Sequence, residues 1–151
     1  NSFTTVGGTL PGVNNFRYLG IVLVQSRNFR CSLSNAKKSF YRSLNAIFGR
    51  IGRQSSEEVV LQLMSRKCLP ILLYGLEACP LNKSDLNSLD FAVNRFLMKL
   101  FNTINVDIIA ECRSFFNVPL PSCSISHRAD TFVKKYNNCG NALCKILAGI
   151  G

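Results

Sequence analysis

The chain has 151 residues, enough for one domain, and 47% of them are hydrophobic, which excludes a disordered tail. The formal net charge is +10 at pH 7, and no acidic residue precedes Glu57, whereas these basic residues do: Arg17, Arg27, Arg30, Lys37, Lys38, Arg42, Arg50 and Arg53. A local field of this sign favours a phosphate-bearing partner, either a nucleic acid or an anionic membrane surface.

Strand and turn signals occupy residues 1–28, and the clearest of them is the stretch "NNFRYLGIVLV" at 14–24. Aromatic and β-branched residues predict two strands, at 16–18 and 21–24. Between them, Leu19 and Gly20 predict a two-residue hairpin turn, because glycine readily takes the positive φ that such turns require. A bulge at Gly20, or a close approach of another backbone, is the alternative interpretation.

The next segment changes to a hydrophobic period of three and four residues, which predicts a helix. Its apolar stripe consists of Leu33, Ala36, Phe40, Leu44, Ile47 or Phe48, and Ile51. The cationic side chains of Lys37, Lys38 and Arg42 fall outside this stripe. We expect Gly49 and Gly52 to end the helix.

A second helix is predicted from about Glu57, because Ser55 and Glu58 have the spacing of a capping box. Pro70 should kink or stop it. The segment "LPILLYGLEACPL" at 69–81 is apolar on all sides, so we expect a buried helix that continues beyond Pro70. Its predicted core residues are Leu72, Leu73, Tyr74 and Leu76. We expect Glu77 to pair with an arginine or lysine of a neighbouring helix.

A third helix is predicted over the stretch "NKSDLNSLDFAVNRFLMKLFN" at 82–102, capped by Ser84 or Asn82. Its apolar stripe consists of Leu86, Leu89, Val93, Phe96, Leu97 and Leu100, and the aromatic residues Phe91, Phe96 and Phe101 are expected in the core. Two weaker helical segments follow, at about 107–116 and 126–147, separated by the breaker "NVPLPS". The predicted fold is therefore mainly α with an N-terminal β-hairpin (α+β) and a bundle of about four or five helices.

Cysteine and hydropathy patterns limit the class of protein. The seven cysteines are scattered without a C-x-x-C pair, and His127 is the single histidine, so we expect no zinc site. Reduced thiols suggest an intracellular protein, nuclear or cytoplasmic. The longest uncharged apolar stretch, from Cys68 to Leu76, is far shorter than the roughly 20 residues of a membrane-spanning helix. The sequence begins without Met, and we expect it to be part of a longer protein.

The sequence lacks the common signatures of enzymatic sites. It contains no phosphate-binding G-x-x-x-x-G-K, no G-x-G-x-x-G, no H-E-x-x-H and no G-x-S-x-G. No two acidic residues have the pattern of a catalytic dyad, and one histidine beside scattered cysteines is more typical of a surface residue than of a nucleophilic pair. The residues alone predict no chemistry.

The order of four segments resembles the C-terminal side of the reverse transcriptase domain of non-LTR (LINE-like) retrotransposons. These segments are "FRYLG" at 16–20, "LPILLYGLEACPL" at 69–81, "LDFAVNRFLMKLF" at 89–101 and "FFNVPLPSCSISHRA" at 115–129. In that family an aromatic-Leu-Gly hairpin closes the palm as the primer grip, and a helical thumb follows it. The resemblance covers nearly the whole chain. It implies a palm-edge hairpin at 1–30, a thumb-like helical domain at 31–104 and a helical C-terminal extension at 105–151.

The resemblance also implies what this chain lacks. Polymerisation in the family depends on an adjacent aspartate pair that holds two Mg²⁺ ions. This sequence has no Asp-Asp, and no aspartate precedes Asp85. We therefore expect no cofactor in this chain, Mg²⁺ only in the N-terminal fingers and palm of the parent polyprotein, and no independent polymerase activity. The implied function is to clamp the duplex of RNA template and DNA primer.

The implied nucleic-acid-binding residues form two groups. The hairpin residues Arg17, Tyr18, Leu19 and Gly20 would meet the primer strand, and the helix residues Lys37, Lys38 and Arg42 would contact phosphates. The alternative for the first group is an ordinary structural hairpin in which aromatic side chains pack on the helices. The alternative for the second is a solvated helix face.

Two other functions remain open from the sequence. The cationic helix is compatible with a free-standing basic module that binds an anionic membrane surface or a protein partner. A non-functional retroelement remnant is the third possibility, because Cys79 stands where the family commonly has Trp.

Overall fold

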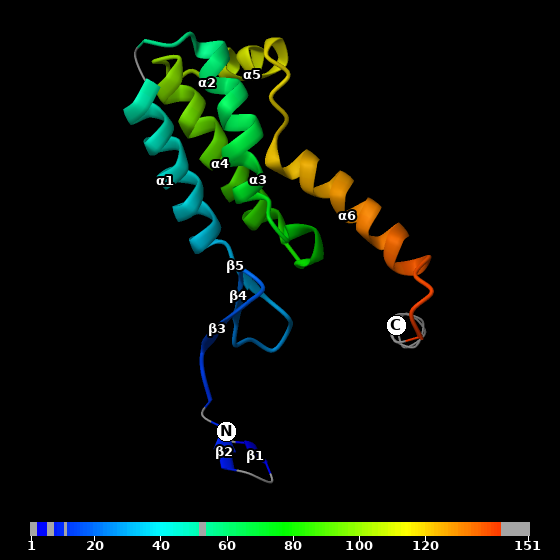
Figure 1. The fold of residues 1–151 in the computed structure, drawn as a ribbon. Helices are drawn as coiled ribbons and strands as arrows, with labels where there is room; N and C mark the ends of the chain where they lie inside the picture. Colours follow the sequence, from blue (N-terminus) through cyan, green and yellow to red (C-terminus); the bar gives the residue numbers. More distant parts are fainter. Residues whose placement is uncertain (1–2, 6–7, 11, 52–53, 143–151) are drawn as a thin grey trace.

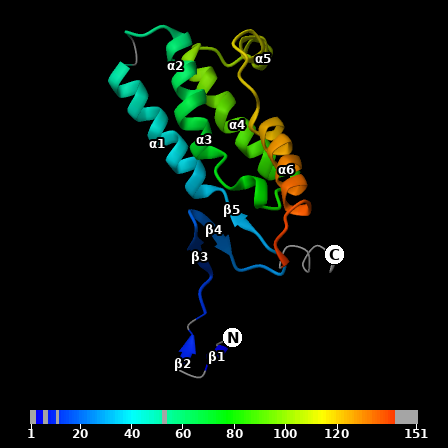
Figure 2. The ribbon, with the colours of Figure 1, turned by 45° about the vertical axis from the view of Figure 1, so that its right-hand side comes forward.

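The computed structural model describes residues 3–5, 8–10, 12–51 and 54–142. It confirms the predicted fold class, since a helical bundle follows a small antiparallel sheet (Figure 1). The sheet lies below the start of the first helix, and a shorter two-stranded hairpin forms the lower end of the molecule. The same arrangement is seen after a turn of the molecule in Figure 2.

The hairpin predicted at 14–24 is confirmed. Strand β3 (Asn15–Tyr18) pairs antiparallel with β4 (Ile21–Val24), and the pairing of Tyr18 with Ile21 leaves a two-residue turn. Leu19 and Gly20 both have positive φ, 47° and 89°, as a type I′ turn requires. A strand that the sequence did not predict, β5 (Cys31–Ser32), adds to the other edge of β4. Strands β1 (Phe3–Thr5) and β2 (Gly8–Leu10) form a separate hairpin.

Helix α1 (Ser34–Ile51) forms where the apolar period predicted it, and its stripe enters the core at Phe40 and Leu44. The expected end at Gly49 is wrong, because the helix continues through this residue. No side chain or backbone lies within 4 Å of the position where a Gly49 Cβ would stand, so glycine here meets no special demand. The other expected terminator, Gly52, lies outside the described residues.

The second helix is continuous across Pro70, through three segments: α2 (Glu57–Leu63), the π-helical turn η1 (Met64–Cys68) and α3 (Leu69–Leu72). In the π-turn, Leu69 N–H donates to the carbonyl of Met64, five residues back. The wider turn makes room for the pyrrolidine ring of Pro70, which in a regular α-helix would clash with the preceding turn. The predicted capping box is wrong, since the N-cap is Ser56 and its side chain makes no capping hydrogen bond.

The segment after α3 is only partly buried. Leu72, Leu73 and Leu76 belong to the core, but Tyr74 is 61% exposed, so its predicted burial is wrong. The reason is a reversal of the chain at Gly75, with φ 69°, before the short 3-10 helix η2 (Leu76–Ala78). Glu77 was expected to pair with an arginine or lysine of a neighbouring helix, but its Oε2 is buried without a hydrogen bond.

Helix α4 (Lys83–Leu100) has the predicted cap at Asn82. The Asn82 side chain accepts from Asp85 N–H at 2.8 Å, and the Asp85 carboxylate accepts from Asn82 N–H at 3.2 Å. Phe96 is buried as predicted, but Phe91 is exposed. Phe91 lies on the opposite side of the helix from the Leu89 stripe, so three aromatic residues in sequence do not share one face.

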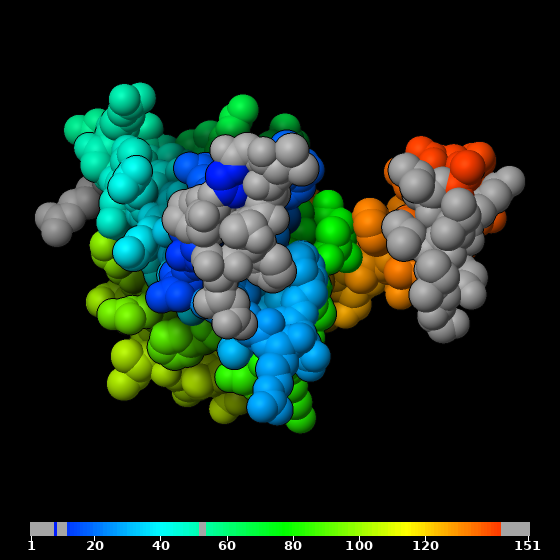
Figure 3. Space-filling view, turned by 90° about the horizontal axis from the view of Figure 1, so that it is seen from below, coloured from blue at the N-terminus to red at the C-terminus, as the bar shows by residue number. Residues whose placement is uncertain are grey.

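The last two helices are α5 (Val106–Phe115) and α6 (Pro121–Asn137). The predicted start of the last helix at Ser126 is wrong, because Pro121 occupies the first turn, where its fixed φ suits a helix. The predicted end near Leu147 lies outside the described residues. Helix α6 buries Pro121 and Ile125 in its first half, and in the view from below its later part stands to one side of the bundle (Figure 3).

One hydrophobic core joins α1, the α2–η1–α3 helix and α4, centred on Phe40, Met64, Leu72, Leu89 and Leu97. Among the described residues, the helices are all too short or too polar to cross a membrane.

Candidate nucleic-acid interface

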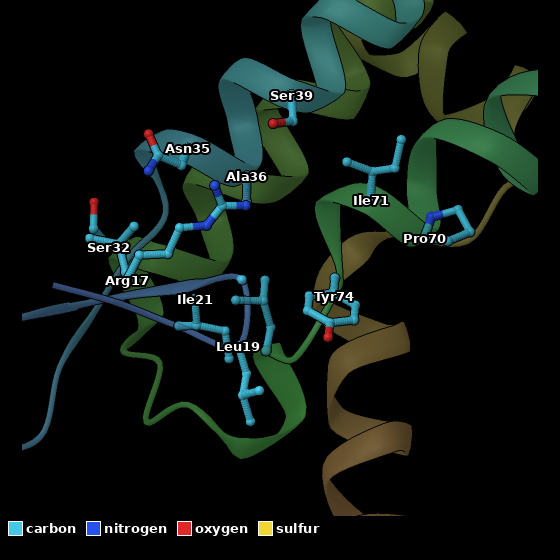
Figure 4. Close-up of a pocket in the computed structure, with 13 residues that line it drawn as sticks. Arg17, Leu19, Ile21, Ser32, Asn35, Ala36, Ser39, Pro70, Ile71 and Tyr74 are labelled. Atoms are coloured by element: carbon cyan, nitrogen blue, oxygen red, sulfur yellow. The ribbon is translucent and has the colours of Figure 1, made fainter.

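A groove of about 600 Å³ lies between the hairpin tip, the start of α1 and helix α3. Figure 4 shows its lining residues, with Arg17 and Leu19 on the hairpin, Asn35 and Ser39 on α1, and Tyr74 after α3. No acidic residue lines this groove. The lining therefore combines apolar surface, hydrogen-bonding groups and one guanidinium.

Two glycines hold the hairpin tip against the turn after α3. A Cβ at Gly20 would stand 3.0 Å from Cε1 of Tyr74, and a Cβ at Gly75 would stand 2.6 Å from Cδ1 of Ile21. Each glycine thus leaves space for a side chain of the other segment. Both also need a positive φ, 89° and 69°. Gly20 therefore serves as the predicted turn residue and also leaves space for the Tyr74 ring. The neighbour is a side chain, and not the other backbone that the alternative interpretation required.

Leu19 forms the exposed tip of the hairpin. It is a non-glycine residue at φ 47°, a conformation that costs an ordinary side chain about 1–2 kcal/mol. Its side chain is 72% exposed, so contacts within this chain do not offset the cost. A strained, apolar and exposed residue of this kind is a candidate for contact with a ligand.

The neighbouring residues of β3 point to different sides, because side chains alternate along a strand. Arg17 lines the groove with Leu19, and Figure 4 shows it directed toward the start of α1. Phe16 and Tyr18 lie on the other face and are both exposed. An ordinary structural hairpin would require these two rings to pack on the helices, and their exposure shows that they do not.

The three basic residues of α1 do not share one surface. Lys38 and Arg42 are exposed and one turn apart, on the face that continues from Asn35 and Ser39. Lys37 lies on the other flank and is half-buried, and its Nζ donates to Ser88 Oγ on α4 at 2.7 Å. Of the predicted basic residues, Arg17 alone lines the groove. Lys38 and Arg42 lie on the solvent-exposed face of α1, and Lys37 lies on the flank toward α4.

Sequence reasoning missed four polar residues of the groove, Ser32, Asn35, Ser39 and Tyr74. A signal for Tyr74 was available in the glycine that follows it, because a glycine in the left-handed conformation commonly ends a helix, so the apolar run need not continue as one buried helix. No comparable signal marks Asn35 and Ser39, which look like any polar residues of a helix face.

Cys79, which follows the turn at Gly75, is not suited to nucleophilic chemistry. Burial, followed by a hydrogen bond with the Cys31 thiol, raises the pKa of Cys79 to about 12. Its thiol donates to the Gly75 carbonyl at 3.6 Å, so the group stays protonated at neutral pH. Within the described ranges, no cluster of three His, Cys, Asp or Glu side chains could hold a metal ion.

Comparison of the chain with family models, with curated proteins and with solved structures finds no match.

Proposed function

We propose that this chain is the primer-grip and thumb region of a non-LTR retrotransposon reverse transcriptase, and that it clamps a duplex of RNA template and DNA primer. The proposal joins the resemblance of the four sequence segments to the properties of the hairpin groove. It assigns the chain a binding role, because the sequence has no adjacent aspartates to hold two Mg²⁺ ions.

The observation that carries the proposal is the exposed hairpin tip beside a basic helix face. Leu19 is strained and solvent-exposed, and Arg17 lies next to it in a groove without acidic residues. Lys38 and Arg42 extend the positive surface along α1. Such a surface suits a partner with regularly spaced phosphates and an accessible sugar or base edge at the tip.

Membrane binding by the cationic helix receives less support. An interfacial helix buries its apolar face in lipid, but the apolar face of α1 is already covered by the core at Phe40 and Leu44. Insertion would require the bundle to open.

The test is a titration of the chain with an RNA/DNA duplex at two salt concentrations. If Arg17, Lys38 and Arg42 each contact a phosphate, affinity should fall about 30-fold between about 50 and 200 mM salt. The triple variant Arg17→Ala/Lys38→Ala/Arg42→Ala should bind weakly and should lose most of this salt dependence.

The matched control is Arg66→Ala/Lys67→Ala/Lys83→Ala, which removes the same charge from exposed positions outside the groove. It should retain most of the affinity. Equal loss in both variants would show that only net charge matters and would contradict a clamp at the hairpin. Anionic vesicles in the same titration should bind less tightly than the duplex.

A further inference from the structure

A second groove lies on the other flank of α1, between this helix and α4. It has a volume of about 380 Å³ and is lined by Tyr41, Leu44, Asn45, Phe48, Arg95, Phe96 and Lys99. None of these residues belongs to the hairpin groove. The two grooves are separate because the buried stripe of α1 runs between their lining residues.

The helical spacing explains how this groove combines rings with cations. Tyr41 and Phe48 lie two turns apart on one side of α1, and Arg95 and Lys99 lie one turn apart on α4. Residues at these spacings face the same way. One wall therefore presents aromatic rings and the other presents a guanidinium and an ammonium.

Contacts between α1 and α4 hold the walls of the groove. One turn before Tyr41 on α1, Lys37 Nζ donates to Ser88 Oγ at 2.7 Å, which joins the two helices outside the groove lining. Within the lining, the rings of Phe48 and Phe96 meet edge to face with centroids 5.7 Å apart. Lys99 Nζ lies 5.4 Å from the centroid of the Phe48 ring, so its ammonium is held at the wall. The groove is thus pre-formed.

No acidic residue lines the groove, so no carboxylate of the lining competes with a bound anion for Arg95 and Lys99. Arg95 and Lys99 are exposed, whereas Tyr41 and Phe48 are half-buried. A base that is paired in a duplex could not reach rings at this depth, but an unpaired base can be turned out and stacked on an aromatic side chain.

We propose that the α1–α4 groove binds an unpaired nucleotide of a single-stranded nucleic acid, with its base against the Tyr41 ring and its phosphate at Arg95 and Lys99. This site goes beyond the duplex clamp of the hairpin side, because it uses other residues and another form of nucleic acid.

The experiment measures binding of the full chain to a fluorescent oligothymidylate of about eight nucleotides, a length within the usual range of single-strand sites. We expect the variant Arg95→Gln/Lys99→Gln to bind about 10-fold more weakly. The matched control Arg66→Gln/Lys67→Gln removes the same charge from the exposed side of η1 and should change affinity less than about twofold. Equal effects of the two variants would overturn the proposal.

An abasic oligonucleotide of the same length tests the role of the rings. It keeps every phosphate, so it should bind about 10-fold more weakly than oligothymidylate only if bases stack in the groove. Equal affinity would overturn the nucleotide site. The variant Tyr41→Leu should weaken binding while retaining the folded circular dichroism spectrum. Photo-crosslinks from a 4-thiothymidine oligonucleotide should map to residues 41–48, and crosslinks confined to other segments would contradict the assignment.

Parallel titrations separate this site from the hairpin groove. The variant Arg17→Ala, at a position that lines only the hairpin groove, should weaken duplex binding and leave oligothymidylate binding within about twofold. The Arg95→Gln/Lys99→Gln variant should show the reverse. Failure of one arm therefore contradicts one site and leaves the other supported.

Discussion

At the scale of single residues, Leu19 adopts a positive φ in the hairpin turn, a conformation that another residue would adopt at lower energetic cost. Asn-Gly is the favoured pair for a type I′ turn, because asparagine tolerates positive φ. The variant Leu19→Asn should therefore raise the free energy of unfolding by about 1 kcal/mol, as measured by urea denaturation. If the tip contacts the primer strand, the same variant should bind the duplex about 10-fold more weakly, because an apolar contact is lost.

A matched control for this change is Ile104→Asn. Ile104 is 90% exposed and lies between α4 and α5, away from both grooves. This variant should leave duplex affinity unchanged. A Leu19→Asn variant that is more stable and still binds as tightly as the original would contradict a functional role for the tip.

Residue-level prediction was good for the hairpin and uneven elsewhere. The turn at Leu19 and Gly20 follows from local chemistry, since two strands and a glycine leave few alternatives. The side on which Lys37 lies was harder to predict, because that depends on the position of α4. Tyr74 was assigned to the core from its apolar neighbours, whereas the turn at Gly75 exposes it.

At the scale of elements, the hairpin and the helical bundle meet at Gly20 and Gly75, each of which leaves space for a side chain of the other segment. The variant Gly75→Ala must place a side chain at φ 69° and 2.6 Å from Cδ1 of Ile21. The left-handed backbone alone costs about 1–2 kcal/mol, so the free energy of unfolding should fall by at least that amount. Denaturation in urea measures the change.

Gly49→Ala is the control, because a Cβ there meets nothing within 4 Å and Gly49 lies inside α1. Alanine is the better helix former, so this variant should gain about 0.5–1 kcal/mol. A fall in the free energy of unfolding for Gly75→Ala, together with a rise for Gly49→Ala, would locate the strain where the hairpin meets the turn at Gly75. A neutral effect at Gly75 would contradict this close contact.

Element boundaries show where sequence patterns stop being informative. The apolar period of α1 and the cap at Asn82 were sufficient to predict two long helices. The π-turn before Pro70 could not be predicted, because proline is compatible with a kink, an end or a wider turn until the packing around it is known. The short strand β5 was missed because two residues carry no period.

At the scale of the whole molecule, the two grooves use opposite flanks of one helix. Helix α1 buries its apolar stripe at Phe40 and Leu44 and therefore cannot rotate to favour either side. A change at one groove should leave the other intact as long as the core is packed. The sheet and the bundle should also unfold together, because Ile21 of β4 contacts the turn at Gly75.

Cysteine labelling in increasing urea tests this cooperativity. Cys31 reports on the sheet and Cys68 on the bundle, and both thiols are buried. Burial also raises the pKa of Cys68, so its thiolate, the reactive form, is scarce while the chain is folded. In native buffer the exposed Cys123 should react before the buried Cys31 and Cys68. Cys31 and Cys68 should become reactive at the same urea concentration if the sheet and bundle form one unit.

The urea midpoint in the same experiment should also depend on pH, because of the Cys79 thiol. The folded state raises the pKa of Cys79 to about 12, well above the value of about 8.5 for a free thiol. The neutral thiol therefore favours folding at pH values below about 8.5, and this contribution is lost as the pH rises toward 12. The urea midpoint should fall over this interval, and less so in the variant Cys79→Ala. If Cys31 reacts at lower urea than Cys68 at every pH, the sheet opens independently, and the contact at Gly75 does not hold the two parts together.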